Sequence, residues 1–385
     1  MQVTHIVEFM ILMPLGGSLM RLFSLSPTQF SLAVGSYTFA AGVSGLLFAG
    51  FADRFDRKRL LLIVYACLAV ATLACALSPN FATLVVTRIF AGIFGGVMSS
   101  VVYAIVGDLV PPSHRGRAMG LIGVSFPVAA TIGVPFSLFL ATHLFDWRAP
   151  FIALSIVCAG LCWFAWKKLP SVREHLDRTQ IAPHDHPMRA LWNVFKSTNH
   201  LNAFVLTGLL TFSVFSIVPF IAPVFVKNNI MSEQALPFAY AIGGAATFFS
   251  VQRIGKLSDQ FGHMRVFRWA SLAVLPSALL ITCIGVAPLP AVFLVWALFM
   301  VCTSSRWTAA FALINSAALA QARGGFLSVN SAIMQFASSL GTFVGGALLT
   351  ALPNGEIGHF AYVGALSVAA SVAAYAWASR VRSVA

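Results

Sequence analysis

Long apolar runs alternate with short polar gaps along the whole chain. A helix needs about 20 apolar residues to cross the hydrocarbon core of a bilayer, and runs of that kind recur from one end of the chain to the other. The gaps contain residues that favour turns, as at Pro353-Asn354-Gly355. We predict twelve membrane-spanning helices, at approximately 3–23, 28–50, 60–77, 81–107, 117–141, 149–166, 201–225, 234–254, 266–286, 289–312, 326–351 and 359–378.

The composition excludes a soluble globular protein and a disordered one. Of 385 residues, 59% are hydrophobic and 9% are charged, and the mean hydropathy is +0.87. Soluble domains carry about 25% charged residues. The net charge of +13 would point to nucleic acid in a soluble protein. Here the basic residues lie in the gaps between apolar runs, so we expect no nucleic-acid partner and interpret the charge as membrane orientation.

The basic residues divide unequally between the two sides of the membrane. With a cytoplasmic N-terminus, the cytoplasmic loops and ends hold 19 Lys and Arg and the opposite loops hold 3. The positive-inside rule then predicts that both termini are cytoplasmic. The longest polar stretch divides the predicted spans six and six. We expect an all-α membrane protein with two pseudo-symmetric six-helix bundles, residues 1–166 and 201–385, joined by a cytoplasmic linker at 167–200.

The sequence predicts no metal and no cofactor. His184 and His186 lie in the linker and are suitable metal ligands, but no further ligands accompany them, and a structural metal site needs a closed ligand set. The six cysteines all lie inside apolar runs, where small packing residues are expected.

The two halves of the sequence repeat the same landmarks. A charged loop follows the second predicted span, and a related loop follows the eighth. The aspartates of these loops lie 206 positions apart, and two Arg-Gly pairs lie 208 apart, at Asp53 and Asp259 and at Arg115-Gly116 and Arg323-Gly324. A duplicated six-helix unit with a binding site between its copies is typical of secondary transporters.

The first loop resembles the signature loop of the major facilitator superfamily, G-x-L-A-D-R-x-G-R-K/R. Its charged positions are matched by Asp53, Arg54, Arg57 and Lys58. Ala49 and Asp56 replace its two glycines. The loop in the second half restores both glycines, as Gly255 and Gly262, and has the aspartate, as Asp259, but it lacks the arginine after the aspartate.

Stretches 37–42, 107–112 and 115–120 are similar to the drug/proton antiporter branch of that superfamily, near its arabinose-efflux-permease-like members. The resemblance implies proton-coupled export of small organic molecules by alternating access. It also implies an ion pair between Arg57 and Asp108 that helps to close the cytoplasmic side. The antiporter motif of the fifth span is incomplete, so an importer on the same fold stays an alternative, and a non-transporting receptor or scaffold is a third hypothesis.

Few charged residues lie inside the predicted spans, where a charge costs about 2.5–3.5 kcal/mol. Glu8 is the only acidic residue clearly at depth, so we predict that it carries the coupling proton. The alternative is an acid whose side chain extends to the cytoplasmic edge. Three further polar residues inside spans are candidates for the substrate cavity: Arg88, Arg306 and Gln335. The resemblance supports the first, because superfamily antiporters often carry an arginine early in the fourth span.

Enzyme motifs do not occur in the sequence, which has no Walker loop, no HExxH and no G-x-S-x-G. We therefore expect a transporter and not an enzyme. Its partners are expected to be a small-molecule substrate, protons and the lipid bilayer of a bacterial inner membrane, and the protein is expected to be a monomer.

Overall fold

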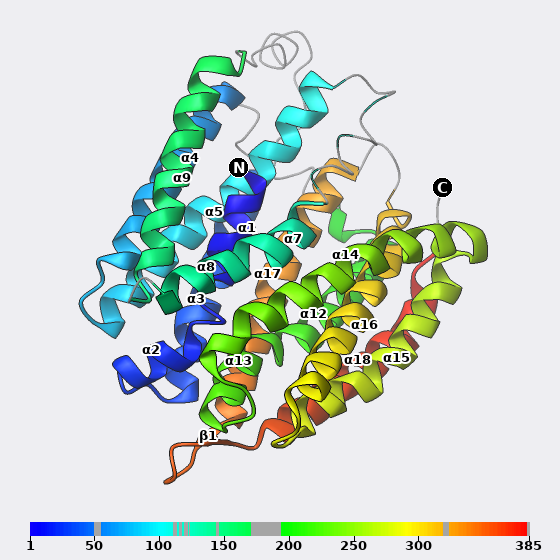
Figure 1. The fold of residues 1–385 in the computed structure, drawn as a ribbon. Coiled ribbons are helices and arrows are strands. Elements are labelled where there is room, and N and C mark those ends of the chain that lie inside the picture. The colour runs from blue at the N-terminus through cyan, green and yellow to red at the C-terminus, as the bar shows by residue number, and fades with distance from the viewer. Residues whose placement is uncertain are drawn as a thin grey trace, which may run out of the picture.

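The structure is a computed structural model, and its described part is almost entirely helical (Figure 1). That part comprises residues 1–49, 55–110, 114, 118, 122, 124–143, 146–170, 194–318 and 323–382. The side chains of six of these residues are not described, namely those of positions 49, 103, 107, 108, 127 and 323.

The described residues before 170 form, in chain order, α1 (Gln2–Met10), α2 (Gly16–Leu22), α3 (Pro27–Ala49), α4 (Arg57–Ala76), α5 (Phe81–Leu109), α7 (Ser125–Val128), the π-helix η2 (Ala129–Gly133), α8 (Val134–His143) and α9 (Ala149–Lys168). The segment after residue 194 contains α12 (Thr198–Phe215), α13 (Val218–Lys227), η3 (Glu233–Ala235), α14 (Leu236–Phe261), α15 (His263–Cys283), α16 (Leu289–Asn315), α17 (Arg323–Leu348), a hairpin of β1 (Thr350–Ala351) and β2 (Ile357–Gly358), α18 (Phe360–Trp377) and η4 (Ala378–Arg380).

Polar residues in the gaps begin the long apolar helices. The Asp56 side chain accepts a hydrogen bond from the Lys58 amide at 3.0 Å and caps α4. Asn80 and Thr83 form a reciprocal capping box at the start of α5. Such caps satisfy amide groups that the first helical turn leaves without a partner. The gaps predicted from turn residues therefore also define where these helices start.

Eight helical segments in the described part are long and apolar enough to cross a membrane. The predicted count of twelve stays a prediction, because the expected spans 3–23, 117–141, 234–254 and 326–351 are not among these eight. The first, 3–23, is divided into α1 and α2 by a turn at residues 11–15. The seventh is divided into α12 and α13 by a short break at Ser216 and Ile217, next to Pro219 in the first turn of α13. Proline lacks an amide donor and favours a helix start over a helix interior.

Helices from distant parts of the chain meet along one contact surface, which we call the seam. It separates the helices before residue 170 from those after residue 194. Across the seam, α3 packs along α17, α14 packs against α7, η2 and α8, and α2 packs against α13. On one side α5 packs against α3 and α4, and on the other α16 packs against α14 and α15.

The buried apolar core is arranged differently at the two ends of the molecule. At the end that carries α2, α13 and the β hairpin, here called the hairpin end, one cluster combines side chains from both sides of the seam, from Leu12 and Phe30 to Phe220 and Trp296. At the opposite end, where α9 ends and α12 begins, there are two clusters in the described part. One comes from α1, α3, α4, α5, η2 and α9, and the other comes mainly from α12, α15, α16, α17 and α18. The core of the described part is therefore joined across the seam at the hairpin end and divided at the opposite end, here called the linker end.

Candidate functional site

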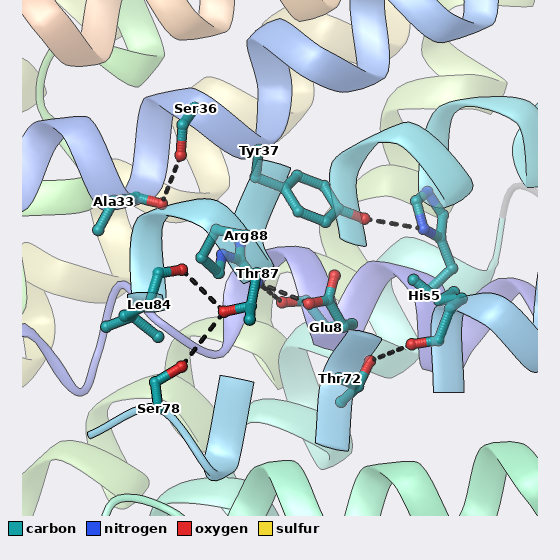
Figure 2. Close-up of polar contacts among 11 residues, drawn as sticks. His5, Glu8, Ala33, Ser36, Tyr37, Thr72, Ser78, Leu84, Thr87 and Arg88 are labelled. Carbon is teal, nitrogen blue, oxygen red and sulfur yellow. Dashed lines mark hydrogen bonds and ion pairs between the residues drawn. The ribbon is translucent and has the colours of Figure 1, made fainter. Parts of the chain in front are cut away.

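An ion pair buried among the helices before residue 170 joins α1 to α5. Arg88 Nη1 lies 2.6 Å from Glu8 Oε1, and both side chains have no exposed surface (Figure 2). The two residues that the sequence marks as intramembrane charges are thus direct partners. The alternative in which Glu8 extends to the cytoplasmic edge is wrong, because its side chain is fully enclosed.

The break after α1 explains why the pair forms at this position. The last carbonyl groups of a helix have no partner within the helix, and α1 ends at Met10. Arg88 Nη1 also donates to the Glu8 main-chain carbonyl at 3.1 Å. A cation is favoured at the C-terminal end of a helix, where the carbonyl dipoles converge. The guanidinium therefore binds the side chain and the main chain of one residue.

Two further buried side chains extend this cluster. The guanidinium carbon of Arg88 lies 4.4 Å from the centroid of the Tyr37 ring, within the range of a cation–π contact. The Tyr37 hydroxyl forms a hydrogen bond with Nδ1 of His5 at 3.1 Å. Figure 2 shows His5 and Glu8 on one helix with Tyr37 and Arg88 opposite them. We call these four residues the polar cluster.

Glycines on α5 make room for the polar cluster. A Cβ atom at Gly92 would lie 2.2 Å from the Tyr37 carbonyl oxygen, so α3 and α5 are in close contact there. A Cβ atom at Gly95 would lie 2.3 Å from the Tyr37 hydroxyl and 2.9 Å from the His5 ring. Small residues allow helices to approach closely in membranes. Here they also leave the space in which the phenol and the imidazole meet.

The polar cluster is only partly satisfied by the protein. Glu8 Oε2, Arg88 Nε and Arg88 Nη2 are buried and have no hydrogen-bond partner among the described residues. An unmatched buried polar group costs about 1–3 kcal/mol. The cluster therefore has one acceptor and two donor groups to offer to a proton or a polar ligand.

The polar cluster lies beside the seam, near two helix breaks. Phe9, next to Glu8, contacts Phe215 across the seam with ring centroids 5.7 Å apart, and it lies equally close to the Tyr37 ring. Phe9 comes just before the break between α1 and α2, and Phe215 just before the break between α12 and α13. Interrupted helices at corresponding positions of two repeats are a mark of transporter binding sites.

Arg306, the other intramembrane arginine, has neutral partners. It is 2% exposed and donates to Ser371 Oγ at 2.8 Å and to Ser213 Oγ at 2.9 Å, which ties α16 to α18 and α12. Gln335 is half-buried on α17, the helix that packs along α3. In the described part, no hydrogen bond or ion pair joins either residue to Glu8 or Arg88, so the structure does not bring the three cavity candidates together.

The charged loop that resembles the superfamily signature lies only partly within the described residues. Asp53 and Arg54 lie outside the described residues, as does the side chain of Asp108. Arg57 is buried and donates to the Ala104 carbonyl at 2.7 Å, one turn before Asp108 on α5. Lys58 lies in the first turn of α4. The start of α4 therefore lies against the end of α5, and the expected pair of Arg57 with Asp108 stays a prediction.

The second copy of the loop differs from the expectation. The predicted eighth span ends at 254 and leaves Gly255 and Asp259 in a loop, but α14 continues through both to Phe261. This boundary was wrong because a helix needs backbone hydrogen bonds and not apolar side chains to continue. It ends at Gly262, whose φ of +86° suits glycine and starts the turn into α15.

A polar contact at the hairpin end has no signal in the sequence. Arg21 of α2 forms an ion pair with Oε1 of Glu233 in η3, across the seam. Ser18 Oγ donates to the same oxygen at 3.1 Å. From the sequence alone, Arg21 is one of the three basic residues in the loops opposite the cytoplasm. The two partners are 212 positions apart, so neither spacing nor a motif connects them.

The comparisons with known proteins agree with one another on the family. The sequence model of the Major Facilitator Superfamily matches residues 1–299. A chloramphenicol resistance protein of Streptomyces lividans is 29% identical over 255 residues, which cover 63% of this chain and 64% of that protein. A chloramphenicol efflux pump of Mycobacterium tuberculosis is 28% identical over 144 residues, 37% of this chain and 35% of that one. The chain thus spans less than two thirds of the length of these two relatives.

The fold comparison covers nearly the whole molecule. A crystal structure of a D-xylose-proton symporter superposes with a TM-score of 0.76 over 97% of this chain and 95% of that chain, at 16% sequence identity. At this identity the superposition shows the fold alone. With the family match over 299 residues, it establishes that the chain is a member of the major facilitator superfamily, a family of membrane transporters.

Proposed function

We propose that this protein exports small organic molecules from a bacterial cell in exchange for protons. Transport would proceed by alternating access between two six-helix bundles, residues 1–166 and 201–385, joined by a cytoplasmic linker at 167–200. The observation that carries this proposal is the buried, partly satisfied pair of Glu8 and Arg88 beside the seam.

The pair offers a direct way to couple a proton to a substrate. With Glu8 ionised, its charge is balanced by Arg88 at 2.6 Å. Protonation of Glu8 removes the ionic attraction and frees the guanidinium, whose Nε and Nη2 already lack partners in the described part. A substrate that accepts hydrogen bonds from Arg88 would favour proton release from Glu8, and a proton would favour substrate release. Such competition shifts a population between two states.

The divided core supports alternating access. Because the basic residues place the linker end in the cytoplasm, this conformation would be closed outside, where one core crosses the seam, and would face inward. Polar residues along α17 fit this interpretation. Ser338 and Thr342, toward the hairpin end, are buried, whereas Ser331, toward the linker end, is exposed.

The aromatic rings around the polar cluster suggest the class of substrate. Phe9, Tyr37 and Phe215 supply flat apolar surface, and Arg88 and Glu8 supply a donor and an acceptor. This combination suits an uncharged molecule that has an aromatic ring and amide or hydroxyl groups. Chloramphenicol, named in two relatives, is such a molecule and is the first substrate to test. Arg306 and Gln335 stay candidates for a more distant part of the cavity.

The direction of transport can be tested with everted membrane vesicles. An acid interior should drive labelled chloramphenicol into everted vesicles that contain the protein, and an uncoupler should abolish the accumulation. Glu8→Gln should abolish concentrative uptake while substrate binding persists. Glu356→Gln, the same change in the β-hairpin connection, is the matched control and should transport normally.

Two outcomes would contradict the proposal. Accumulation only in right-side-out vesicles with an acid exterior would assign the protein as an importer, as the symporter of the same fold is by name. Uphill transport by Glu8→Gln with unchanged pH dependence would show that another group carries the proton. Binding without any flux in either orientation would favour a receptor.

A further inference from the structure

The polar side chains of α1 form a line that points from Glu8 toward the linker end. Glu8 lies near the C-terminal end of α1, and His5 lies one turn earlier. Residues three apart on a helix are neighbours, with Cβ atoms about 5–6 Å apart. Thr4, beside His5, shares a hydrogen bond of 2.6 Å with the Tyr65 hydroxyl. We propose that His5 relays the coupling proton between Glu8 and the cytoplasmic side, a step that rests on the proton-coupled function proposed above.

The contact with Tyr37 gives His5 a defined orientation. Its Nδ1 atom meets the Tyr37 hydroxyl at 3.1 Å, and no hydrogen bond to Nε2 occurs among the described residues. A neutral imidazole can accept a proton on one ring nitrogen and release a proton from the other. Tyr37 also carries Arg88 over its ring face, so one side chain links the relay to the ion pair. In this proposal Glu8 holds the coupling proton, and His5 passes it on.

The transfer balances in protons and charge. The Glu8 carboxyl loses its proton and becomes a carboxylate, whose charge Arg88 balances at 2.6 Å. The Tyr37 hydroxyl, which interacts with Glu8 and meets His5 Nδ1 at 3.1 Å, gives its proton to Nδ1 and takes up the proton of Glu8. The His5 ring becomes an imidazolium and then gives the proton on Nε2 to water on the cytoplasmic side. No electron is transferred, and one proton moves per cycle.

A glycine on α5 makes room for the contact between His5 and Tyr37. Gly95 leaves space where a methyl group would lie 2.9 Å from the His5 ring and 2.3 Å from the Tyr37 hydroxyl. Buried polar groups in a membrane are expensive and are usually functional. His5, Glu8 and Arg88 are all buried within one small region.

The titratable groups around His5 ionise in different pH ranges. The titratable and charged groups near it, taken from α1, α3, α4, α5 and α9, are the Met1 amine, Glu8, Tyr37, Tyr65, Arg88 and Cys158. Tyrosine and cysteine ordinarily titrate at about 10 and about 8.5, and arginine stays charged. A pH profile between about 5 and 7.5 therefore reports on glutamate, histidine and the Met1 amine, which ordinarily titrates just above this range, and the difference between wild type and His5→Gln isolates the histidine.

The experiment measures proton movement and substrate movement separately. Wild type, His5→Gln and Glu8→Gln are reconstituted in proteoliposomes with a trapped pH dye and labelled chloramphenicol. His200→Gln is the control, because His200 is also buried, on α12, and its Nδ1 contacts only the Val194 carbonyl at 3.0 Å. We expect His5→Gln to bind chloramphenicol and exchange it downhill as wild type does. Its proton-driven uptake should be about 100-fold slower, as for loss of a general acid–base group.

A second variant tests the same relay if His5→Gln does not fold. Tyr37→Phe keeps the ring beneath Arg88 and removes the hydroxyl that orients His5. The ratio of its proton-driven uptake to its own downhill exchange should also fall, because the downhill exchange measures any effect of the change on substrate binding. Wild-type proton flux and pH profile in a folded His5→Gln, or in Tyr37→Phe, would overturn the relay while leaving proton coupling intact. Wild-type protein that moves substrate without protons would overturn both proposals.

Discussion

Phe9 and Phe215 face each other across the seam with ring centroids 5.7 Å apart, each just before the break in its own helix. The contact joins a residue beside the polar cluster to the opposite side of the molecule. Because it crosses the seam, it must change whenever the two sides move relative to each other.

Phe9→Leu should therefore weaken substrate binding more than it weakens the fold. An aromatic contact contributes about 0.5–1.5 kcal/mol beyond buried area, so loss of a contact between the Phe9 ring and the aromatic ring of the substrate would raise the Kd for chloramphenicol about 2- to 13-fold. Fluorescence or calorimetric titration measures the affinity. Phe249→Leu is the control, because Phe249 is exposed on α14 and should bind normally. Equal effects of the two changes would show that Phe9 does not border the site.

Removal of Arg88 should destabilise the protein strongly, and a second change should restore much of the loss. Arg88→Met leaves Glu8 buried with its charge unbalanced, which typically costs about 3–5 kcal/mol. Glu8→Gln with Arg88→Met removes both charges, so its Tm should lie well above that of Arg88→Met alone. Thermal unfolding of purified protein at neutral pH checks the order. Equal Tm values for the single and double variants would mean that the pair is not ionised in the folded protein.

Gly95→Ala should disturb the polar cluster, because the added methyl group would meet the Tyr37 hydroxyl and the His5 ring. Overpacking of this kind costs about 1–3 kcal/mol. Gly160→Ala is the matched control, since Gly160 lies on α9 with nothing within 4 Å of its added Cβ atom. That change should be neutral or slightly stabilising. Comparable Tm losses for both variants would indicate a general effect of glycine replacement.

The contact of Arg21 with Glu233 should influence the conformational equilibrium more visibly than stability. The side chains are 53% and 34% exposed, and exposed pairs contribute about 0–1 kcal/mol. Arg21→Ala should shift the equilibrium toward the outward-open state by up to about fivefold. The readout is labelling of Val226→Cys, on α13 beside Gly17 of α2, by an impermeant maleimide in protein whose six native cysteines are replaced. The exchanged pair Arg21→Glu with Glu233→Arg should return labelling to the wild-type rate, and a lack of any change in Arg21→Ala would exclude a closing role.

Asp53→Asn tests the charged loop of the signature motif. If the loop holds the cytoplasmic side closed in the outward-open state, this change should abolish transport and leave expression and membrane insertion intact. Vesicle uptake and protein quantity are measured in parallel, and Asp259→Asn gives the corresponding change in the second half. Near-normal uptake by Asp53→Asn would show that the loop charges only set topology.

Hydropathy and charge predict the helices and the special residues of this protein, but not how those residues meet. Glu8 and Arg88 stand out one at a time as charges in apolar runs, and Pro14 and Gly16-Gly17 mark the interruption of the first span. Their contact depends on the rotation of α1 and α5 about their axes. A span that is apolar on all sides does not define that rotation.

Other features of the site depend on distances that sequence spacing does not encode. The contact of Arg21 with Glu233 and that of Phe9 with Phe215 join residues more than two hundred positions apart. The end of α14 was missed for a different reason. Polar residues such as Arg253 and Lys256 end an apolar run, whereas the helix extends beyond them to Phe261.

The pairing of Glu8 with Arg88 also has an electrical consequence. With the carboxylate ionised, the two charges cancel and the pair presents no net charge to the membrane field. When Glu8 takes up a proton, Arg88 is left as one net positive charge inside the protein. A full charge that crosses the membrane exchanges about 2.3 kcal/mol for each 100 mV. A cell interior at negative potential would therefore draw the proton-loaded form inward, and membrane voltage would drive the cycle even without a pH difference.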